Sequence, residues 1–294
     1  MEVEIIWGTM GAMDDYLRRI GADRPARVDI EALRELQLRH LRTVPFENLS
    51  VHLGEEIVLE EGPLLAKVVQ GRRGGICYEV NAAFAALLRD LGFTVRLLAG
   101  RVHTADGQWG IPYDHMALLV EPADGSGRWV ADVGFGEHAH YPLALDDRAE
   151  QSDPAGSFRI VEASGGEASG HGDLDVLRDG EPQYRLETRP RELADFRSGA
   201  WWHSTSPLSN FTRSPVCTRL TADGRITLSG RTLVTTEHGE RHEELLVDDG
   251  EVLAAYRERF GVRLDRVPAD PRDDVGRTGD DRPARARQER RPPA

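Results

Sequence analysis

RGGICYEVN, residues 73–81, joins two glycines and a cysteine to the start of a helical pattern. After Cys77, apolar residues recur at three- and four-residue steps as far as Leu91, and Gly92 is a typical helix end. The pattern therefore predicts a buried helix with Cys77 in its first turn. Unpaired backbone N–H groups and the positive end of the helix dipole would favour a thiolate there, and the thiolate is the nucleophilic form of cysteine.

A lone cysteine is also commonly a small apolar core residue, so two readings of Cys77 stand side by side. The preceding glycines, Gly74 and Gly75, would let backbone or substrate come close to the sulfur. The charged neighbours Arg73 and Glu79 also favour a reactive thiol over an inert one. Partners elsewhere in the chain have to decide between the two.

The bulk composition narrows the classes of function. The chain has 294 residues, 39% hydrophobic and 30% charged, which suits one large domain or two to three small ones. Its formal net charge of −13 argues against non-specific binding to nucleic acid or to anionic membranes. Two cysteines form no disulfide framework, and we expect no signal peptide and no membrane span, which points to the cytoplasm. Cys217 has no basic or glycine context and is expected to be inert packing.

Periodicity divides the chain into parts. Residues 12–92 read as mostly helical, including a helix that Asp29 would cap and another at 63–70. From residue 93 short aliphatic runs alternate with glycine-bearing turns, as in an antiparallel barrel or sandwich. A third layer follows a helical turn at 192–202 and ends in a helix at 251–260. Residues 268–294 are rich in charge and proline and are predicted to be a disordered tail.

The runs around residues 115–120 and 129–135 supply candidate partners for the cysteine. His115 opens the first run, and Asp132 interrupts the second, where an unpaired carboxylate would be costly. A hairpin turn at 123–127 would place the two residues on adjacent strands, within a diagonal step of about 7–8 Å between Cβ atoms. A nucleophilic cysteine needs a base, and the base needs an orienting group. We therefore predict a triad of Cys77, His115 and Asp132.

At these residues the sequence resembles a known family. Residues 73–81 look like the RGGxCxExN signature of the arylamine N-acetyltransferases, in which Arg73, Gly74, Gly75 and Glu79 are motif positions. Residues 114–120 and 132–136 are similar to the family's His and Asp motifs, and residues 16–21 and 44–49 also match. The resemblance runs from about residue 16 to residue 264.

The resemblance implies an α+β fold with a cysteine-protease-like core. Its parts would be a helical bundle carrying the nucleophile (1–92), an antiparallel β-barrel (93–200) and an α/β lid (201–267), followed by the tail (268–294). It also implies acetyl-CoA as donor substrate, an arylamine or hydrazine as acceptor, and no metal or prosthetic group. Cys77 would carry the acyl group, with His115 as base and Asp132 as orienting group. Val102, Phe135 and Gly136 would form the acceptor site of an enzyme of xenobiotic metabolism.

Two departures from the family concern the acceptor and the donor. Ala200 stands where the family usually has Asn, and the insert at 146–172 is poorly matched. Three alternatives stay open: a related amide synthase that closes a polyketide macrolactam, a cysteine hydrolase, and a non-catalytic binding protein with the same fold. The oligomeric state is not indicated.

Other residues were weighed as sites. His238 and His242 have a zinc-like spacing, but Gly239 argues against the helix that this spacing needs. His138 is expected to be solvated in a polar turn, and Trp201 and Trp202 are expected to pack in the lid.

Overall fold

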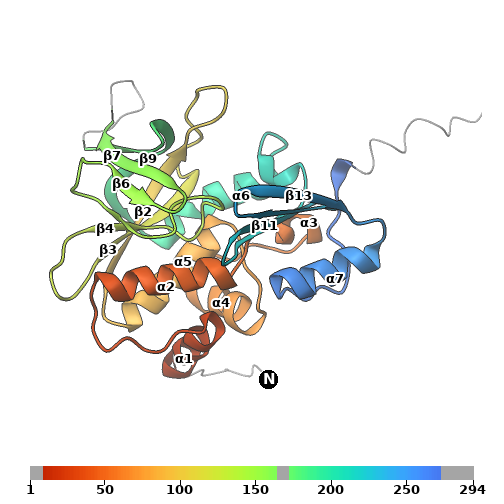
Figure 1. Cartoon of the computed structure of the whole chain (residues 1–294), viewed down its shortest axis with the longest axis horizontal. Coiled ribbons are helices and arrows are strands. Elements are labelled where there is room, and N and C mark those ends of the chain that lie inside the picture. Colours follow the sequence, from red (N-terminus) through yellow and green to blue (C-terminus); the bar gives the residue numbers. More distant parts are fainter. Residues whose placement is uncertain (1–8, 164–171, 273–294) are drawn as a thin grey trace, which may run out of the picture.

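The computed structural model describes residues 9–163 and 172–272. Figure 1 shows three regions: helices in the lower middle, a large curved sheet on the left, and a smaller sheet with one helix on the right. The helical elements are α1 (Thr9–Ile20), α2 (Ile30–Thr43), α3 (Leu49–Leu53), α4 (Glu61–Leu65), the π-helical turn η1 (Ala66–Gln70), α5 (Cys77–Asp90), η2 (Leu193–Phe196), α6 (Arg197–Thr205), η3 (Asn210–Thr212) and α7 (Asp249–Phe260).

The strands form two antiparallel sheets. They are β1 (Phe46–Glu47), β2 (Thr94–Val102), β3 (His115–Glu121), β4 (Trp129–Ala131), β5 (Leu143–Ala144), β6 (Gln151–Asp153), β7 (Gly156–Glu162), β8 (Leu174–Arg178), β9 (Glu181–Arg191), β10 (Val216–Leu220), β11 (Gly224–Ser229), β12 (Thr232–Glu237) and β13 (Glu240–Leu245). The larger sheet has the order β5-β4-β3-β2-β9-β8-β7-β6 and curls into a barrel-like shape. The expected α+β architecture with an antiparallel barrel is confirmed.

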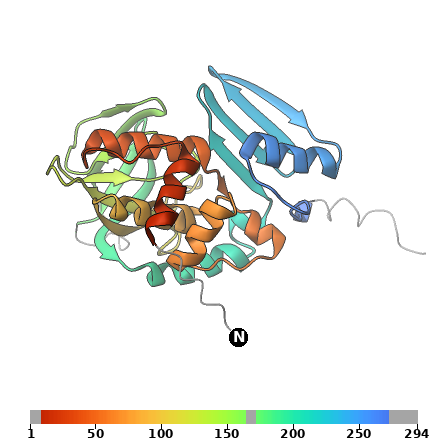
Figure 2. The same ribbon diagram turned by 90° about the horizontal axis from the view of Figure 1, so that it is seen from below.

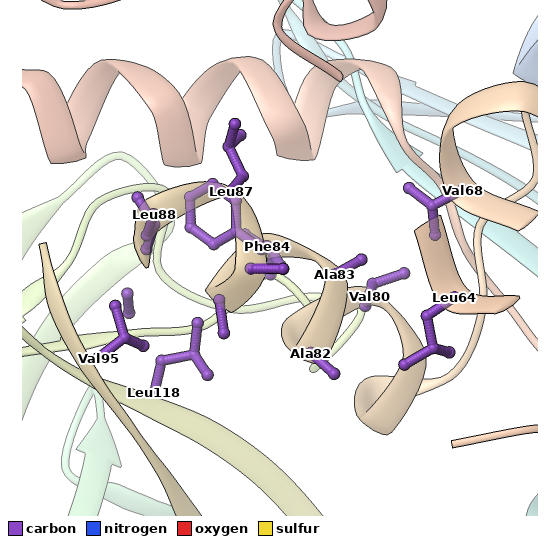
Figure 3. Close-up of a cluster of buried hydrophobic side chains, with 14 of the residues drawn as sticks. Leu64, Val68, Val80, Ala82, Ala83, Phe84, Leu87, Leu88, Val95 and Leu118 are labelled. Atoms are coloured by element: carbon purple, nitrogen blue, oxygen red, sulfur yellow. The ribbon is translucent and has the colours of Figure 1, made fainter. Parts of the chain in front are cut away.

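Helix α5 is the centre of the largest core. It is buried from Cys77 to Leu88, and it ends at Asp90 before Gly92, whose positive φ of 98° suits a helix terminus. Figure 3 shows Val95 and Leu118 of the barrel sheet on one side of this helix, and Leu64 and Val68 of the helical region on the other. Complete burial of a side chain such as Phe84 or Leu87 contributes roughly 2–3 kcal/mol. This packing fixes the end of the helix that carries Cys77.

The smaller sheet joins the helical region to the strands near the C-terminal part of the chain. Its order is β1-β10-β11-β12-β13, so that a strand from the helical region pairs with the C-terminal strands. The Asn48 side chain fixes this junction, because its Oδ1 accepts from Val216 N at 2.7 Å and its Nδ2 donates to Phe211 O at 3.0 Å. Figure 2 shows this sheet and α7 set to one side of the bundle and barrel. The predicted boundary between barrel and lid, at residues 200 and 201, falls inside helix α6. This boundary therefore stays a prediction.

The predicted bounds of helices and strands agree with the structure at some positions and differ at others. Asp29 caps α2 by accepting from Ala32 N at 3.0 Å, as the sequence predicts. The helix expected at 63–70 is divided between α4 and η1. The strand expected at 129–135 is shorter in the structure, where β4 ends at Ala131. The short strands β1, β5 and β6 were not predicted, because two- and three-residue strands carry too little periodicity.

Several other expectations need correction. His138 is not solvated but 6% exposed, because Phe135, Phe158 and Tyr184 surround its ring. Trp201 is 68% exposed and does not pack in the lid. The start of the predicted tail is ordered, since Ala269 N donates to His52 O at 3.0 Å.

The rest of that tail (273–294), the first residues (1–8) and part of the insert (164–171) lie outside the described residues. Within the described ranges, no helix has the length and apolar character needed to cross a membrane.

Candidate active site

The loop before Cys77 is folded tightly against the strand β1. Gly75 O accepts from Glu47 N at 3.0 Å. A Cβ at Gly74 would lie 1.8 Å from Pro45 O, and one at Gly75 would lie 2.5 Å from a carboxylate oxygen of Glu79. These glycines therefore make room for the protein's own backbone and for Glu79. We expected these glycines to let backbone or substrate approach the sulfur. The structure shows close approach of the protein's own groups at both positions.

Glu79 fixes the first turn of α5. Its Oε2 accepts from Ile76 N at 3.1 Å, which satisfies one of the unpaired N–H groups at the helix start. Its Oε1 accepts from Lys67 Nζ at 2.6 Å. Burial raises the pKa of Glu79 above its usual value, and the Lys67 ammonium opposes that shift. Cys77 thus starts a helix whose position is held from two sides.

Arg73 neutralises a buried carboxylate under the same loop. Its Nε donates to Glu47 Oε1 at 2.9 Å, and its Nη1 donates to Glu55 Oε2 at 3.1 Å. The Glu47 side chain is fully buried, while that of Glu55 is 47% exposed. The arginine of the signature is therefore a structural partner of Glu47.

Replacing Arg73 with methionine is expected to lower the free energy of unfolding by about 3–5 kcal/mol, because it leaves the Glu47 carboxylate buried without its partner. Urea unfolding at neutral pH measures this change. Arg96→Met is the matched control, since Arg96 and Glu121 form a solvent-exposed pair at 2.7 Å that contributes at most about 1 kcal/mol. Equal losses in both variants would contradict the assignment.

His115 and Asp132 meet as the sequence predicts. Ala131 pairs with Leu118, so the next residue, Asp132, lies diagonally across from His115 on the same side of the sheet. His115 Nε2 donates to Asp132 Oδ2 at 2.7 Å, and both side chains are 3% exposed. This bond leaves Nδ1 of the imidazole for the Cys77 side chain, which also hydrogen-bonds to His115.

Two neighbours hold the carboxylate of Asp132. Its Oδ1 accepts from Asn81 Nδ2 at 3.0 Å and from Gly134 N at 2.8 Å. Asn81 also accepts from Val133 N at 2.9 Å through its Oδ1. Sequence reasoning did not assign these two roles. A signal was present for Asn81, because it lies four residues after Cys77 and therefore on the same face of the helix.

The electrostatics favour a protonated His115. Burial is the largest influence and lowers its pKa, but the Asp132 carboxylate and Cys77 together raise the pKa of His115 to about 10. For Asp132 burial acts in the opposite direction and raises the pKa. His115 and the Asn81 amide nevertheless hold the pKa of Asp132 below its usual value. The pair is therefore an imidazolium beside a carboxylate at neutral pH, next to the thiol.

A cleft of about 490 Å³ opens onto Cys77 and His115. The residues that line it are Phe46, Cys77, Val102, Thr104, Trp109, Gly110, Ile111, Asp114, His115, Gly134, Phe135, Trp202, His203, Leu208, Asn210 and Phe211.

The predicted acceptor residues divide at this cleft. Val102 and Phe135 line it, and the Phe135 ring stands edge-on to the His115 ring with centroids 5.2 Å apart. Gly136 does not line it; its carbonyl oxygen accepts from Arg225 Nη1 at 2.5 Å. Trp202 lines the cleft, which the sequence did not indicate.

The other candidate residues lie elsewhere. Cys217 is fully buried in β10, and burial raises the pKa of its thiol. His238 lies at the turn before β13 and His242 within that strand, so they do not share a helix. Among the described residues, no three His, Cys, Asp or Glu side chains gather as a metal site.

Gly134 is predicted to be intolerant of a side chain. A Cβ there would lie 2.7 Å from both Cys77 Cα and Asn81 Nδ2. Gly134→Ala is therefore expected to cost about 1–3 kcal/mol of stability. Displacement of Cys77 by about 1 Å should lower kcat/KM roughly 100-fold. Thermal melts and initial rates measure the two effects. Gly62→Ala is the control, since a Cβ at Gly62 meets open space; equal rates in both variants would refute the tight contact.

Comparison with known proteins gives the family. A family model described as N-acetyltransferase matches residues 29–268. The arylamine N-acetyltransferase of Escherichia coli (strain K12) is 34% identical over 261 residues, covering 86% of this chain and 89% of that protein. The chain belongs to the arylamine N-acetyltransferase family. It is therefore an acyltransferase, as the resemblance implies.

Solved structures of this family share the fold. The arylamine N-acetyltransferase of Mycobacterium smegmatis has a TM-score of 0.76 at 34% identity, covering 86% of this chain and 92% of that one. The enzyme of Mycobacterium marinum, solved in complex with CoA, has a TM-score of 0.75 at 30% identity, covering 85% and 92%. The bundle, barrel and lid of this chain are thus the architecture of an arylamine N-acetyltransferase.

Proposed function

We propose that the chain transfers the acetyl group of acetyl-CoA to an arylamine or arylhydrazine through a thioester on Cys77, in a ping-pong cycle. The observation that carries this proposal is the cleft itself. Cys77 at the start of α5 and the bonded pair of His115 and Asp132 line or adjoin the same space of about 490 Å³.

In the first half-reaction the Cys77 thiolate attacks the carbonyl carbon of the acetyl thioester. A new C–S bond forms, the C–S bond to CoA breaks, and CoA leaves as a thiolate that takes the proton from His115. Glu79 N and Val80 N donate to Ile76 O, whereas the N–H groups of Cys77 and Tyr78 precede these bonds and suit the oxyanion that forms on the way. Asp132 keeps the imidazole oriented throughout.

In the second half-reaction a neutral amine attacks the acetyl-cysteine. A C–N bond forms, the C–S bond to Cys77 breaks, and His115 takes the proton from the amine nitrogen. Arylamines and hydrazines suit this step because they are weakly basic and keep a free lone pair near neutral pH. A protonated alkylammonium has no lone pair with which to attack.

The M. marinum relative, solved in complex with CoA, supports CoA as the carrier of the acetyl group. Arginine side chains or backbone N–H groups would contact its phosphates, since the chain as a whole carries a net charge of −13. The side chains used in the proposed steps are those of Cys77, His115 and Asp132. We propose that the protein acts in the cytoplasm, where both free cysteines stay reduced.

Mass measurement of the intact protein tests this proposal. Incubation with acetyl-CoA should add one acetyl group at Cys77, and an arylamine should remove it and release the acetylated amine. Loss of the adduct to water alone would indicate a hydrolase. Failure with every CoA thioester, together with acylation by a polyketide thioester, would indicate an amide synthase. No adduct with any thioester would indicate a binding protein.

A further inference from the structure

We propose that Trp109 is the surface on which the acceptor's aromatic ring stacks, and that Arg185 behind it tunes this surface against cationic amines. The inference deepens the proposed function and rests on it. Trp109 lines the same cleft as Cys77 and His115. Several aromatic rings line the cleft. Among the described residues, Trp109 is the one of these whose ring has a guanidinium over its face.

The backbone around Trp109 is tied to the end of β2, which pairs with the strand that carries His115. Trp109 forms an antiparallel bridge with His103, and Gly110 N donates to Val102 O at 2.8 Å. A Cβ at Gly110 would lie 1.9 Å from a carboxylate oxygen of Asp114, the residue before His115. This segment is therefore closely packed, and it sets the indole at a fixed place relative to the reacting groups.

Arg185 is built into the sheet behind the indole. Its guanidinium carbon lies 4.5 Å from the centroid of the Trp109 ring. Asp175, its cross-strand neighbour, holds the guanidinium with two bonds, Nε to Oδ1 at 2.7 Å and Nη2 to Oδ2 at 3.0 Å. The Arg185 side chain is 4% exposed, and the His103 ring stands near edge-on to the indole, with centroids 4.9 Å apart. The indole is thus held from behind and from one edge.

This arrangement has an electrostatic consequence for acceptor choice. A guanidinium over one face of an indole draws on the negative potential of the ring, so the other surface attracts a second cation less. An arylamine ring is electron-rich because the amine lone pair is conjugated with it, and it can still stack on the indole. The indole face of Trp109 therefore favours a neutral arylamine over an alkylammonium. Acetyl transfer requires the same preference, because the acceptor nitrogen must have a free lone pair.

The test separates the two half-reactions and uses acceptors with and without a ring. Protein acetylated at Cys77 is mixed with aniline, 4-methoxyaniline or acetohydrazide, which lacks a ring. Trp109→Leu should lower kcat/KM for the two anilines about three- to tenfold, mainly through KM, because it removes the stacking face. For acetohydrazide the change should be at most about twofold. Trp109→Phe should restore most of the loss.

Three further variants complete the design. Trp201→Leu is the matched control, since Trp201 is 68% exposed and does not line the cleft. The neutral double variant Asp175→Asn/Arg185→Gln should make phenyltrimethylammonium, a permanent cation, inhibit about two- to fivefold more tightly, and adding Trp109→Leu should remove that gain.

Equal losses for ring-bearing and ringless acceptors in Trp109→Leu, no loss for either, or unchanged inhibition in the double variant would each overturn the inference. A wild-type protein that forms no acetyl-Cys77 would instead overturn the proposed function, and the inference with it.

Discussion

Cys77→Ser is expected to keep the fold and to lose acetyl transfer by a factor of at least about 10⁴. Cys77 is 3% exposed at the start of α5, and a serine hydroxyl fits the space of the thiol. A hydroxyl does not ionise near neutral pH, however, so the pair of His115 and Asp132 would have no thiolate to stabilise. Mass measurement after incubation with acetyl-CoA should show no adduct, and the initial rate should fall to background.

Cys217→Ala is the control for this experiment. Cys217 is fully buried in β10 and does not line the cleft. We expect this variant to form the acetyl adduct and to turn over within about twofold of the wild type, with a modest loss of stability from the small cavity. Undiminished turnover in Cys77→Ser, or an adduct that depends on Cys217, would remove Cys77 as the acyl carrier.

The meeting of His115 with Asp132 was predictable because it depends on local pattern. The runs before and after the turn at 123–127 are short and apolar, which favours their pairing as neighbours. The sequence left the register of this pair open, because β3 is buried on both faces. The structure pairs Leu118 with Ala131, which puts His115 and Asp132 on the same face. A slip of one residue would have separated them. The start of α5 at Cys77 was predictable for a similar reason, from periodicity and glycine.

The surroundings of Cys77, His115 and Asp132 were not predictable, because they depend on contacts between distant segments. Gly134 gives no periodic signal, and its tight contact with Cys77 exists only once α5 packs against the turn after β4. The stack of Arg185 on Trp109 needs the pairing of β2 with β9, which lies far along the chain. His138 reads as a polar turn residue until three aromatic rings close around it.

The pairing of β1 with β10 shows the same limit. Phe46 pairs with Thr218 across the interval that contains the whole barrel. Residues 44–49 read as an interruption between helices, because a two-residue strand has no period of its own. Residues 44–49 nevertheless lie beside the candidate active site. They supply Glu47 as the partner of Arg73 and Phe46 to the lining of the cleft, so they contact both the loop before Cys77 and the cleft.

Asp132→Asn is expected to lower the rate of Cys77 acetylation by about 10³–10⁴, although the two side chains have nearly the same shape. A carboxamide does not stabilise the imidazolium of His115, and its amide group can donate to Nε2, which favours the wrong tautomer. The pH–rate profile should change with it. In the wild type Asp132 and Cys77 raise the pKa of His115 to about 10, so the proton needed by departing CoA is held up to that pH. Without the carboxylate, the upper limb of the profile should move to lower pH.

Stability gives an independent measure of the same interaction. The folded-state pKa of His115, about 10, lies above its ordinary value of 6.5. The pair therefore contributes its full stabilisation below pH 6.5, down to the acid range in which Asp132 is protonated, and loses it as the pH rises through 10. The difference in melting temperature between wild type and Asp132→Asn should shrink over that range.

Asp146→Asn is the control, because it alters an exposed carboxylate paired with Arg128. It should change neither the rate nor the pH profile by more than about twofold. An Asp132→Asn protein whose upper pH limb stayed in place would mean that another group holds the proton on His115, and the role of Asp132 would then be reduced to packing.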